Sequence, residues 1–187
     1  MQIHARLLAA ALAALPLAGC GDGDALSPDG SMFVATVQGS VQESYRGTGQ
    51  FQASPGDGSH PGMFAIVSRD PVGGQGFFLF REGTHTPRLG SYPLTTSVAG
   101  PNRFGAIYSR RQGGVVEGFT ATSGELVIST SLRGRIKGTF RFHGTRNCAG
   151  TDTGISCTYP LDPGAPTVEV TGSFMAVAGG TLPGPPF

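Results

Sequence analysis

The sequence predicts an all-β domain, an antiparallel sandwich of about nine short strands, with a small closed β-barrel as the alternative. Glycine accounts for 31 residues and proline for 14, and both interrupt helices. No stretch after the N-terminal segment keeps a helical periodicity, whereas alternation of polar and apolar residues is frequent. This alternation places one face of each strand in a core.

The N-terminal segment, residues 1–19, has a charged start at Arg6 and an apolar run over residues 7–17. That run is shorter than the about 20 residues that span a hydrocarbon core, but it fits a secretory signal. It ends in Leu17-Ala18-Gly19-Cys20, which resembles the lipobox of bacterial lipoproteins. The resemblance implies that residues 1–19 are removed and that Cys20 is lipidated. The alternative is an ordinary signal peptide cut nearby, which leaves Cys20 as a stray thiol.

Lipidation of Cys20 predicts a lipid-anchored protein of the bacterial cell envelope, because two or three acyl chains exceed the marginal anchoring of one. The residue after Cys20 is Gly21 rather than Asp, and in similar lipoproteins this favours the outer membrane. Residues 20–31 are small, acidic and turn-rich, so they predict a flexible tether. The aspartates lack the spacing of a calcium loop.

Residues 32–178 predict a single β domain, followed by a Gly/Pro-rich tail over residues 179–187. Turn-forming clusters of Gly, Pro, Asp and Ser separate the strands. The segments around Met63 and Phe78 are apolar on both faces. They therefore predict strands at the centre of a sheet. The expected strands, in order, lie in residues 31–39, 45–53, around Met63, around Phe78, from Phe104, from Gly114, over 125–143 and over 167–177.

Residues 125–143 predict the clearest hairpin, because two alternating segments flank a glycine. Both apolar faces reach the same core with a three-residue loop over 132–134. Gly134 then occupies the bulge position that requires positive φ. This register places Leu126 opposite Phe140 in the core and Glu125 opposite Arg141 on the solvent side.

Cys148 and Cys157 are the two cysteines left once Cys20 is assigned to the anchor. An oxidising compartment predicts a disulfide between them. Their spacing is too wide for a redox or zinc C-x-x-C pair. On the chain-entropy model this bond stabilises the fold by roughly 2.5–3 kcal/mol.

Net charge excludes partners that require a strongly basic protein. The chain has 13 basic and 12 acidic residues, and removal of the segment containing Arg6 balances them. The overall charge therefore favours neither nucleic acid nor an anionic membrane surface, and we expect a contact with the membrane through acyl chains instead. An envelope protein or polymer is the remaining candidate partner.

One strand face concentrates basic side chains. Arg135, Lys137 and Arg141 alternate with apolar residues, so they share a face and form a candidate anion-contact face. We expect this face to be solvated and balanced by Glu125 and other acidic residues, and contact with anionic envelope polymers or lipid phosphates is the alternative. Aromatic residues of this segment fall on the opposite face, which argues against single-stranded nucleic acid.

No motif for catalysis is present, so we expect no enzyme activity, no cofactor and no metal. The glycines form neither a phosphate-binding loop nor a nucleophile elbow. His60 with Asp57, and His85 with Glu82, fit solvated turns better than a base with its orienting carboxylate. The expected role is non-enzymatic binding or structural support.

The alternative function is a lipocalin-like carrier of a small apolar ligand. Its cavity would be lined by Phe77 to Phe80 and by Phe104. Core packing accounts for the same residues, and the G-x-W of such carriers is absent because the chain has no Trp.

The sequence resembles a group of uncharacterised bacterial envelope lipoproteins. The resemblance rests on the lipobox-like motif, on residues 33–39 (FVATVQG), and on later segments at 123–128, 134–142 and 170–174. It implies an all-β fold and an envelope location but no reaction. The Trp that these proteins usually carry after the first strand is missing here, and the loop between Cys148 and Cys157 is an addition.

Overall fold

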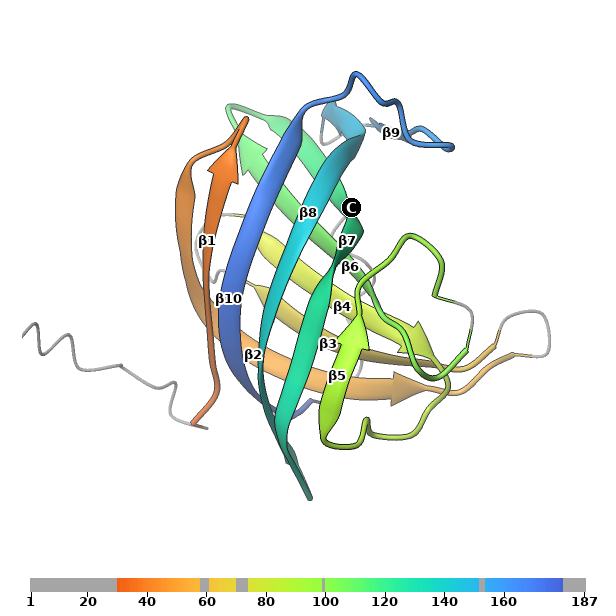
Figure 1. Ribbon diagram of the computed structural model, residues 1–187. Coiled ribbons are helices and arrows are strands. Elements are labelled where there is room, and N and C mark those ends of the chain that lie inside the picture. Colours follow the sequence, from red (N-terminus) through yellow and green to blue (C-terminus); the bar gives the residue numbers. More distant parts are fainter. Residues whose placement is uncertain (1–29, 58–60, 70–73, 99, 152–153, 180–187) are drawn as a thin grey trace, which may run out of the picture.

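The computed structural model describes residues 30–57, 61–69, 74–98, 100–151 and 154–179. The predicted signal peptide, Cys20 and residues 180–187 of the predicted tail therefore lie outside the described residues. The fold is all-β, with ten strands and no helix in these ranges (Figure 1). The strands are β1 (Met32–Gly39), β2 (Glu43–Ser54), β3 (Met63–Arg69), β4 (Gly76–Glu82), β5 (Gly90–Pro93), β6 (Gly105–Gln112), β7 (Val115–Leu132), β8 (Arg135–Thr151), β9 (Gly154–Cys157) and β10 (Thr167–Ala178).

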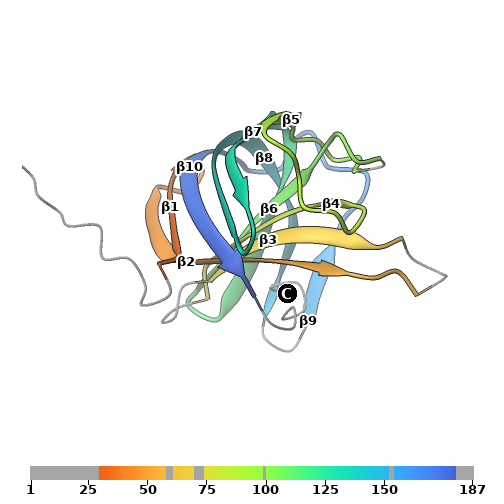
Figure 2. The same cartoon turned by 90° about the horizontal axis from the view of Figure 1, so that it is seen from below.

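The ten strands form one sheet whose pairings close on themselves. Neighbours run in the order β7, β6, β4, β3, β2, β1, β10 and β8, and β8 pairs again with β7. The long β7 pairs on its other edge with β6 and then with β5, and the short β9 extends β8. Figure 2 shows these strands around a common centre. All ladders are antiparallel except a short contact between β10 and β2, so the predicted antiparallel all-β class is confirmed.

Aromatic rings from opposite sides of this strand ring fill the centre. Phe77 of β4 stacks on Phe33 of β1, with ring centroids 5.2 Å apart, and on Tyr108 of β6 at 5.0 Å. Phe140 of β8 lies 5.7 Å from Phe77, and Phe119 of β7 continues the series beyond Tyr108. Opposite sides of the ring thus pack as the two layers of a sandwich do.

Strands β3 and β4 are buried on both faces, as their apolar sequences predict. Ile66 and Leu79 point into the central core and are fully buried. Ala65, Val67 and Phe78 form a second buried cluster on the outer face. Alternation along a strand sends neighbouring residues to opposite faces, so both faces of these strands carry apolar contacts.

The β7–β8 hairpin confirms the predicted pairs but corrects its turn. Leu126 lies opposite Phe140, and Glu125 lies opposite Arg141. The predicted three-residue loop is wrong, because Leu132 pairs with Arg135 and leaves a two-residue turn over 133–134. A register shift between Ile128 and Thr130 supplies the extra residue inside β7 instead. Gly134 has the expected positive φ, at 76°.

Two strands were not expected from the sequence, and one expected break is absent. β5 lies in a segment whose Gly and Pro content predicts a turn, and β9 lies within the predicted disulfide loop. The segments predicted from Gly114 and from Glu125 form the single strand β7. Gly124, with φ of 149°, lets this strand continue through close contact with Phe142.

Candidate functional site

The predicted disulfide is present between β8 and β9. Cys148 and Cys157 face each other directly in the antiparallel ladder, and their Cα atoms lie 4.1 Å apart. The bond therefore fastens a four-residue strand to the edge of β8. Cys20 lies outside the described residues, so its lipidation stays a prediction.

The candidate anion-contact face lies on the outer side of β8. Arg135, Lys137 and Arg141 are exposed and alternate with buried core residues. Arg141 lies opposite Glu125 across the ladder to β7. Lys137 lies beside Met175 of β10 and has no carboxylate opposite it. The structure thus separates the face into a balanced middle and a basic end.

A second polar cluster lies inside the opposite end of the strand ring. We call Glu43, Arg110, Glu117 and Arg146 the charged network; they come from β2, β6, β7 and β8. Arg110 Nη1 donates to Glu43 Oε1 at 2.9 Å, and Arg110 Nη2 lies 2.7 Å from Glu117 Oε2. Arg146 Nη1 donates to Glu117 Oε1 at 2.8 Å. Four strands are therefore linked across the end at which β1 turns into β2.

The charges in this network set one another's protonation. Burial alone raises the pKa of Glu117, but hydrogen bonds from Arg146 and Arg110 and their charges outweigh it and lower the pKa overall. Burial lowers the pKa of the Arg110 guanidinium, but its bonds to Glu117 and Glu43 raise it overall. Both groups are thus held in their charged forms.

The network also joins the aromatic core. Tyr108, fully buried at its ring, donates its hydroxyl hydrogen bond to Glu43 Oε2, which also accepts from Gln75 Nε2 at 2.7 Å. Burial, followed by the bond to Glu43, raises the pKa of Tyr108. All four carboxylate oxygens of Glu43 and Glu117 accept hydrogen bonds. This arrangement stabilises the end of the ring and presents no unoccupied carboxylate.

A different arginine closes the other end. Arg81 of β4 is only 6 % exposed and points inward with the alternation of its strand. Its guanidinium donates to the backbone oxygen of Pro101, and Nη2 donates to that of His85 at 2.6 Å. The charge also lies over the rings of Phe64 and Phe104, 5.9 and 5.6 Å from their centroids. Arg81 therefore fastens the backbone at His85 and at Pro101 over this end.

Arg81 has no carboxylate among its contacts within the described residues. Its Nε is buried and lacks a hydrogen-bond partner there. Burial lowers the pKa of the Arg81 guanidinium, with a smaller opposing effect from Tyr92. A buried cation without a counter-charge is costly, so packing and carbonyl contacts must hold it.

His85 and Glu82, one of the two pairs considered from sequence, do not form a base with its carboxylate. The Glu82 carboxylate accepts the backbone N–H of Gly100 at 2.9 Å, while His85 is exposed and contributes its backbone oxygen to Arg81. His60 lies outside the described residues. In the part of the chain that the structure describes, no three His, Cys, Asp or Glu side chains gather as a metal site would require.

The aromatic residues proposed to line a carrier cavity fall on two faces. Phe77 and Phe104 are fully buried and contact other core rings. The ring of Phe104 lies 5.3 Å from that of Tyr92. Phe78 and Phe80 stack on each other at 4.9 Å on the outer side. Core packing thus accounts for all four.

Comparison of the chain with family models, curated proteins and solved structures finds no match. The described residues include no helix with the length and apolarity needed to cross a membrane.

The charged network and Arg81 were both missed at the level of sequence. A short-turn hairpin around Gly113 would have placed Arg110 opposite Glu117, as the structure does. Likewise, the alternation of β4 places Arg81 on the inner face with Phe77. A charged residue on a predicted core face is the signal that could have revealed the buried position of Arg81.

Proposed function

We propose that the chain is a lipid-anchored module of the bacterial cell envelope with a non-enzymatic binding or structural role. The observation that carries the proposal is the motif Leu17-Ala18-Gly19-Cys20, placed behind a charged start and a short apolar run. The Cys148–Cys157 disulfide supports it, because such bonds persist in oxidising compartments such as the periplasm and the cell surface.

The hydrogen bonds of the buried polar side chains support the non-enzymatic role in this proposal. General-base and nucleophilic catalysis require a group that can reach a substrate. The carboxylates of Glu43 and Glu117 are instead occupied by arginine, tyrosine and glutamine donors. Arg81 is bound to backbone oxygens. These contacts stabilise the ends of the fold, and the packed aromatic centre favours this role over a ligand carrier.

Detergent partitioning of the full chain, expressed in a bacterium that processes lipoproteins, tests the anchor. We expect the wild type in the detergent phase, with a diacylglycerol-modified Cys20 in the mass spectrum of its N-terminal peptide. Cys20→Ser should move to the aqueous phase, because the acyl chains supply the membrane affinity.

The matched control is Cys148→Ser/Cys157→Ser, which removes cysteines but keeps the anchor and should stay in the detergent phase. Equal detergent partitioning of Cys20→Ser and the wild type would contradict the proposal.

A further inference from the structure

We infer that the end of the strand ring at which residue 30 enters the domain is a membrane-facing surface that contacts an anionic phospholipid bilayer. The inference rests on the lipid anchor proposed above. We call this region the tether-end surface; it comprises Arg88, Leu89, Leu132, Arg133, Arg135 and Lys137.

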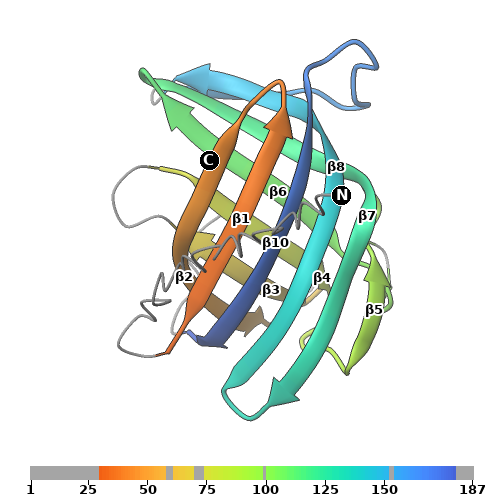
Figure 3. The same ribbon diagram turned by 60° about the vertical axis from the view of Figure 1, so that its left-hand side comes forward.

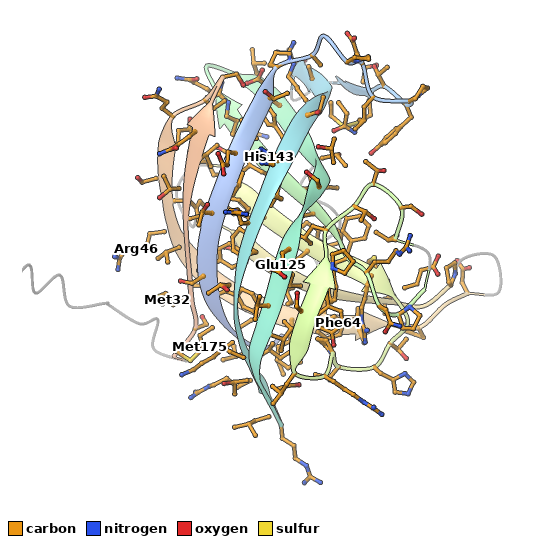
Figure 4. The ribbon with its side chains drawn as sticks, viewed as in Figure 1. Met32, Arg46, Phe64, Glu125, His143 and Met175 are labelled. Carbon is orange, nitrogen blue, oxygen red and sulfur yellow. A yellow bond between two sulfur atoms is a disulfide. The ribbon has the colours of Figure 1, made fainter. Side chains whose placement is uncertain are left out.

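The chain enters the domain beside these residues. A Cβ built on Gly30 would lie 3.3 Å from Nη2 of Arg135. Met32, the first residue of β1, pairs with Met175, which in turn pairs with Lys137. Figures 1 and 3 show β1 beginning at the end where β7 turns into β8, and Figure 4 shows Met32 and Met175 there. Gly30, the first described residue, and the basic end of β8 therefore share one end of the molecule.

Two exposed leucines project from adjacent segments at this end. Leu132 is 67 % exposed at the end of β7, and Leu89 is 64 % exposed just before β5. Ser131 Oγ donates to the backbone oxygen of Pro87 at 2.8 Å, which joins the two segments. The Tyr92 hydroxyl donates to the backbone oxygen of Arg88 at 2.8 Å and fixes the other side of Leu89. The leucines are thus presented together on an ordered support.

Basic residues flank both leucines in the sequence. Arg88 precedes Leu89, and Arg133 and Arg135 follow Leu132. Within the described ranges, none of these three arginines forms an ion pair, in contrast to Arg110 in the charged network. Exposed apolar residues among unpaired basic residues are typical of surfaces that lie at the membrane interface. Each basic residue near an anionic leaflet strengthens binding about fivefold.

The length of the tether favours the same orientation. From Cys20 to Gly30 the extended chain reaches at most about 35 Å, at up to ~3.6 Å per residue. A compact domain of this size has a radius of gyration of about 15 Å, so its long dimension is comparable to the length of the whole tether. The tether-end surface can approach the bilayer directly, whereas the opposite end could do so only with the tether stretched along the domain.

A single introduced tryptophan tests the contact, because the chain has none. We would reconstitute acylated Leu132→Trp in vesicles of phosphatidylethanolamine and phosphatidylglycerol at about 3:1. The matched control is Val115→Trp, at an exposed position on the opposite end of β7. We expect the emission of Leu132→Trp to shift to shorter wavelength and to be strongly quenched by brominated lipid, with neither effect for Val115→Trp. Absence of quenching in Leu132→Trp, or equal quenching in both variants, would overturn the inference.

Sedimentation of the full chain carrying Cys20→Ser separates this surface from the anchor. Arg133→Gln/Arg135→Gln should weaken binding to phosphatidylglycerol vesicles about 25-fold, at about fivefold for each charge. The charge-matched control is Arg111→Gln/Arg141→Gln. Arg111 lies opposite Val116, near the other end of β7, and Arg141 lies in the middle of β8, so this pair should change binding less than about twofold. Equal effects of the two pairs, or no preference over phosphatidylcholine, would overturn the inference.

The outcomes keep the two proposals distinct. If the wild type partitions through Cys20 but the tryptophan of Leu132→Trp stays unquenched, the anchor stands and the surface fails. If Cys20→Ser partitions like the wild type, the anchor fails, and the vesicle comparison of the arginine variants still decides the surface.

Discussion

Arginine closes both ends of the strand ring, but its partners differ. At the end where β1 turns into β2, Arg110 lies between the carboxylates of Glu43 and Glu117, and Arg146 adds a second cation. At the other end, Arg81 lies against two aromatic rings and donates to backbone oxygens. The two ion pairs of Arg110 thus depend on a counter-charge, whereas the contacts of Arg81 depend on packing and on the position of a loop.

The difference teaches how a buried guanidinium is tolerated. An ion pair removed from water stabilises little overall, but removal of one partner leaves the other charge unsatisfied. A lone cation leaves no charged partner behind when it is replaced. The same substitution should therefore have unequal effects at the two ends.

The largest effect is expected for Arg110→Met. It leaves two partly buried carboxylates with fewer donors, so we expect the free energy of unfolding to fall by about 3 kcal/mol. Urea denaturation at pH 7 measures this loss. A loss smaller than that of Arg81→Met would show that the charged network stabilises the fold less than the Arg81 guanidinium does.

A smaller effect, and one that depends on pH, is expected for Glu117→Gln. The folded-state pKa of Glu117 lies below its ordinary value. Its stabilisation is therefore complete above the unfolded pKa of about 4.3 and disappears as the pH falls through the lower folded value. We expect a loss of about 2 kcal/mol at pH 7, less than for a fully buried pair because Arg146 is partly exposed.

Urea denaturation of Glu117→Gln and the wild type at pH 7, 4 and 3 measures that dependence. The difference between the two proteins should shrink toward pH 3. The matched control Glu125→Gln alters an exposed strand face and should change stability by less than about 0.5 kcal/mol. A difference that is constant with pH would contradict the assignment to the Glu117 carboxylate.

The smallest effect is expected for Arg81→Met. Methionine keeps the contact with Phe64 and Phe104 and removes a buried cation whose Nε lacks a partner. Loss of the hydrogen bonds to the backbone opposes this gain, so we expect a net loss of about 1 kcal/mol. Arg81→Ala, which also removes the packing, should cost more in the same urea experiment. Equal losses of stability for the two variants would show that the charge of Arg81, rather than its packing, stabilises this end.

Local pattern was sufficient to predict the fold class, the Cys148–Cys157 bond and the pairing of Leu126 with Phe140. Alternation with period two is a property of neighbouring residues, and two remaining cysteines allow one connectivity. The turn at Gly134 was predicted in part. Its positive φ follows from the residue type, but its length depended on a bulge in β7 that no local signal marks.

The sequence by itself determined that the strands alternate, that one hairpin forms around Gly134, and that Leu17-Ala18-Gly19-Cys20 resembles a lipidation motif. Only the tertiary structure decided that β7 pairs with both β6 and β8 and so closes the ring. Closure of the ring also brings the residues of the charged network together, since Glu43 and Arg110 lie 67 residues apart along the chain. Contacts between distant residues depend on the register of every intervening strand, and a single bulge changes that register.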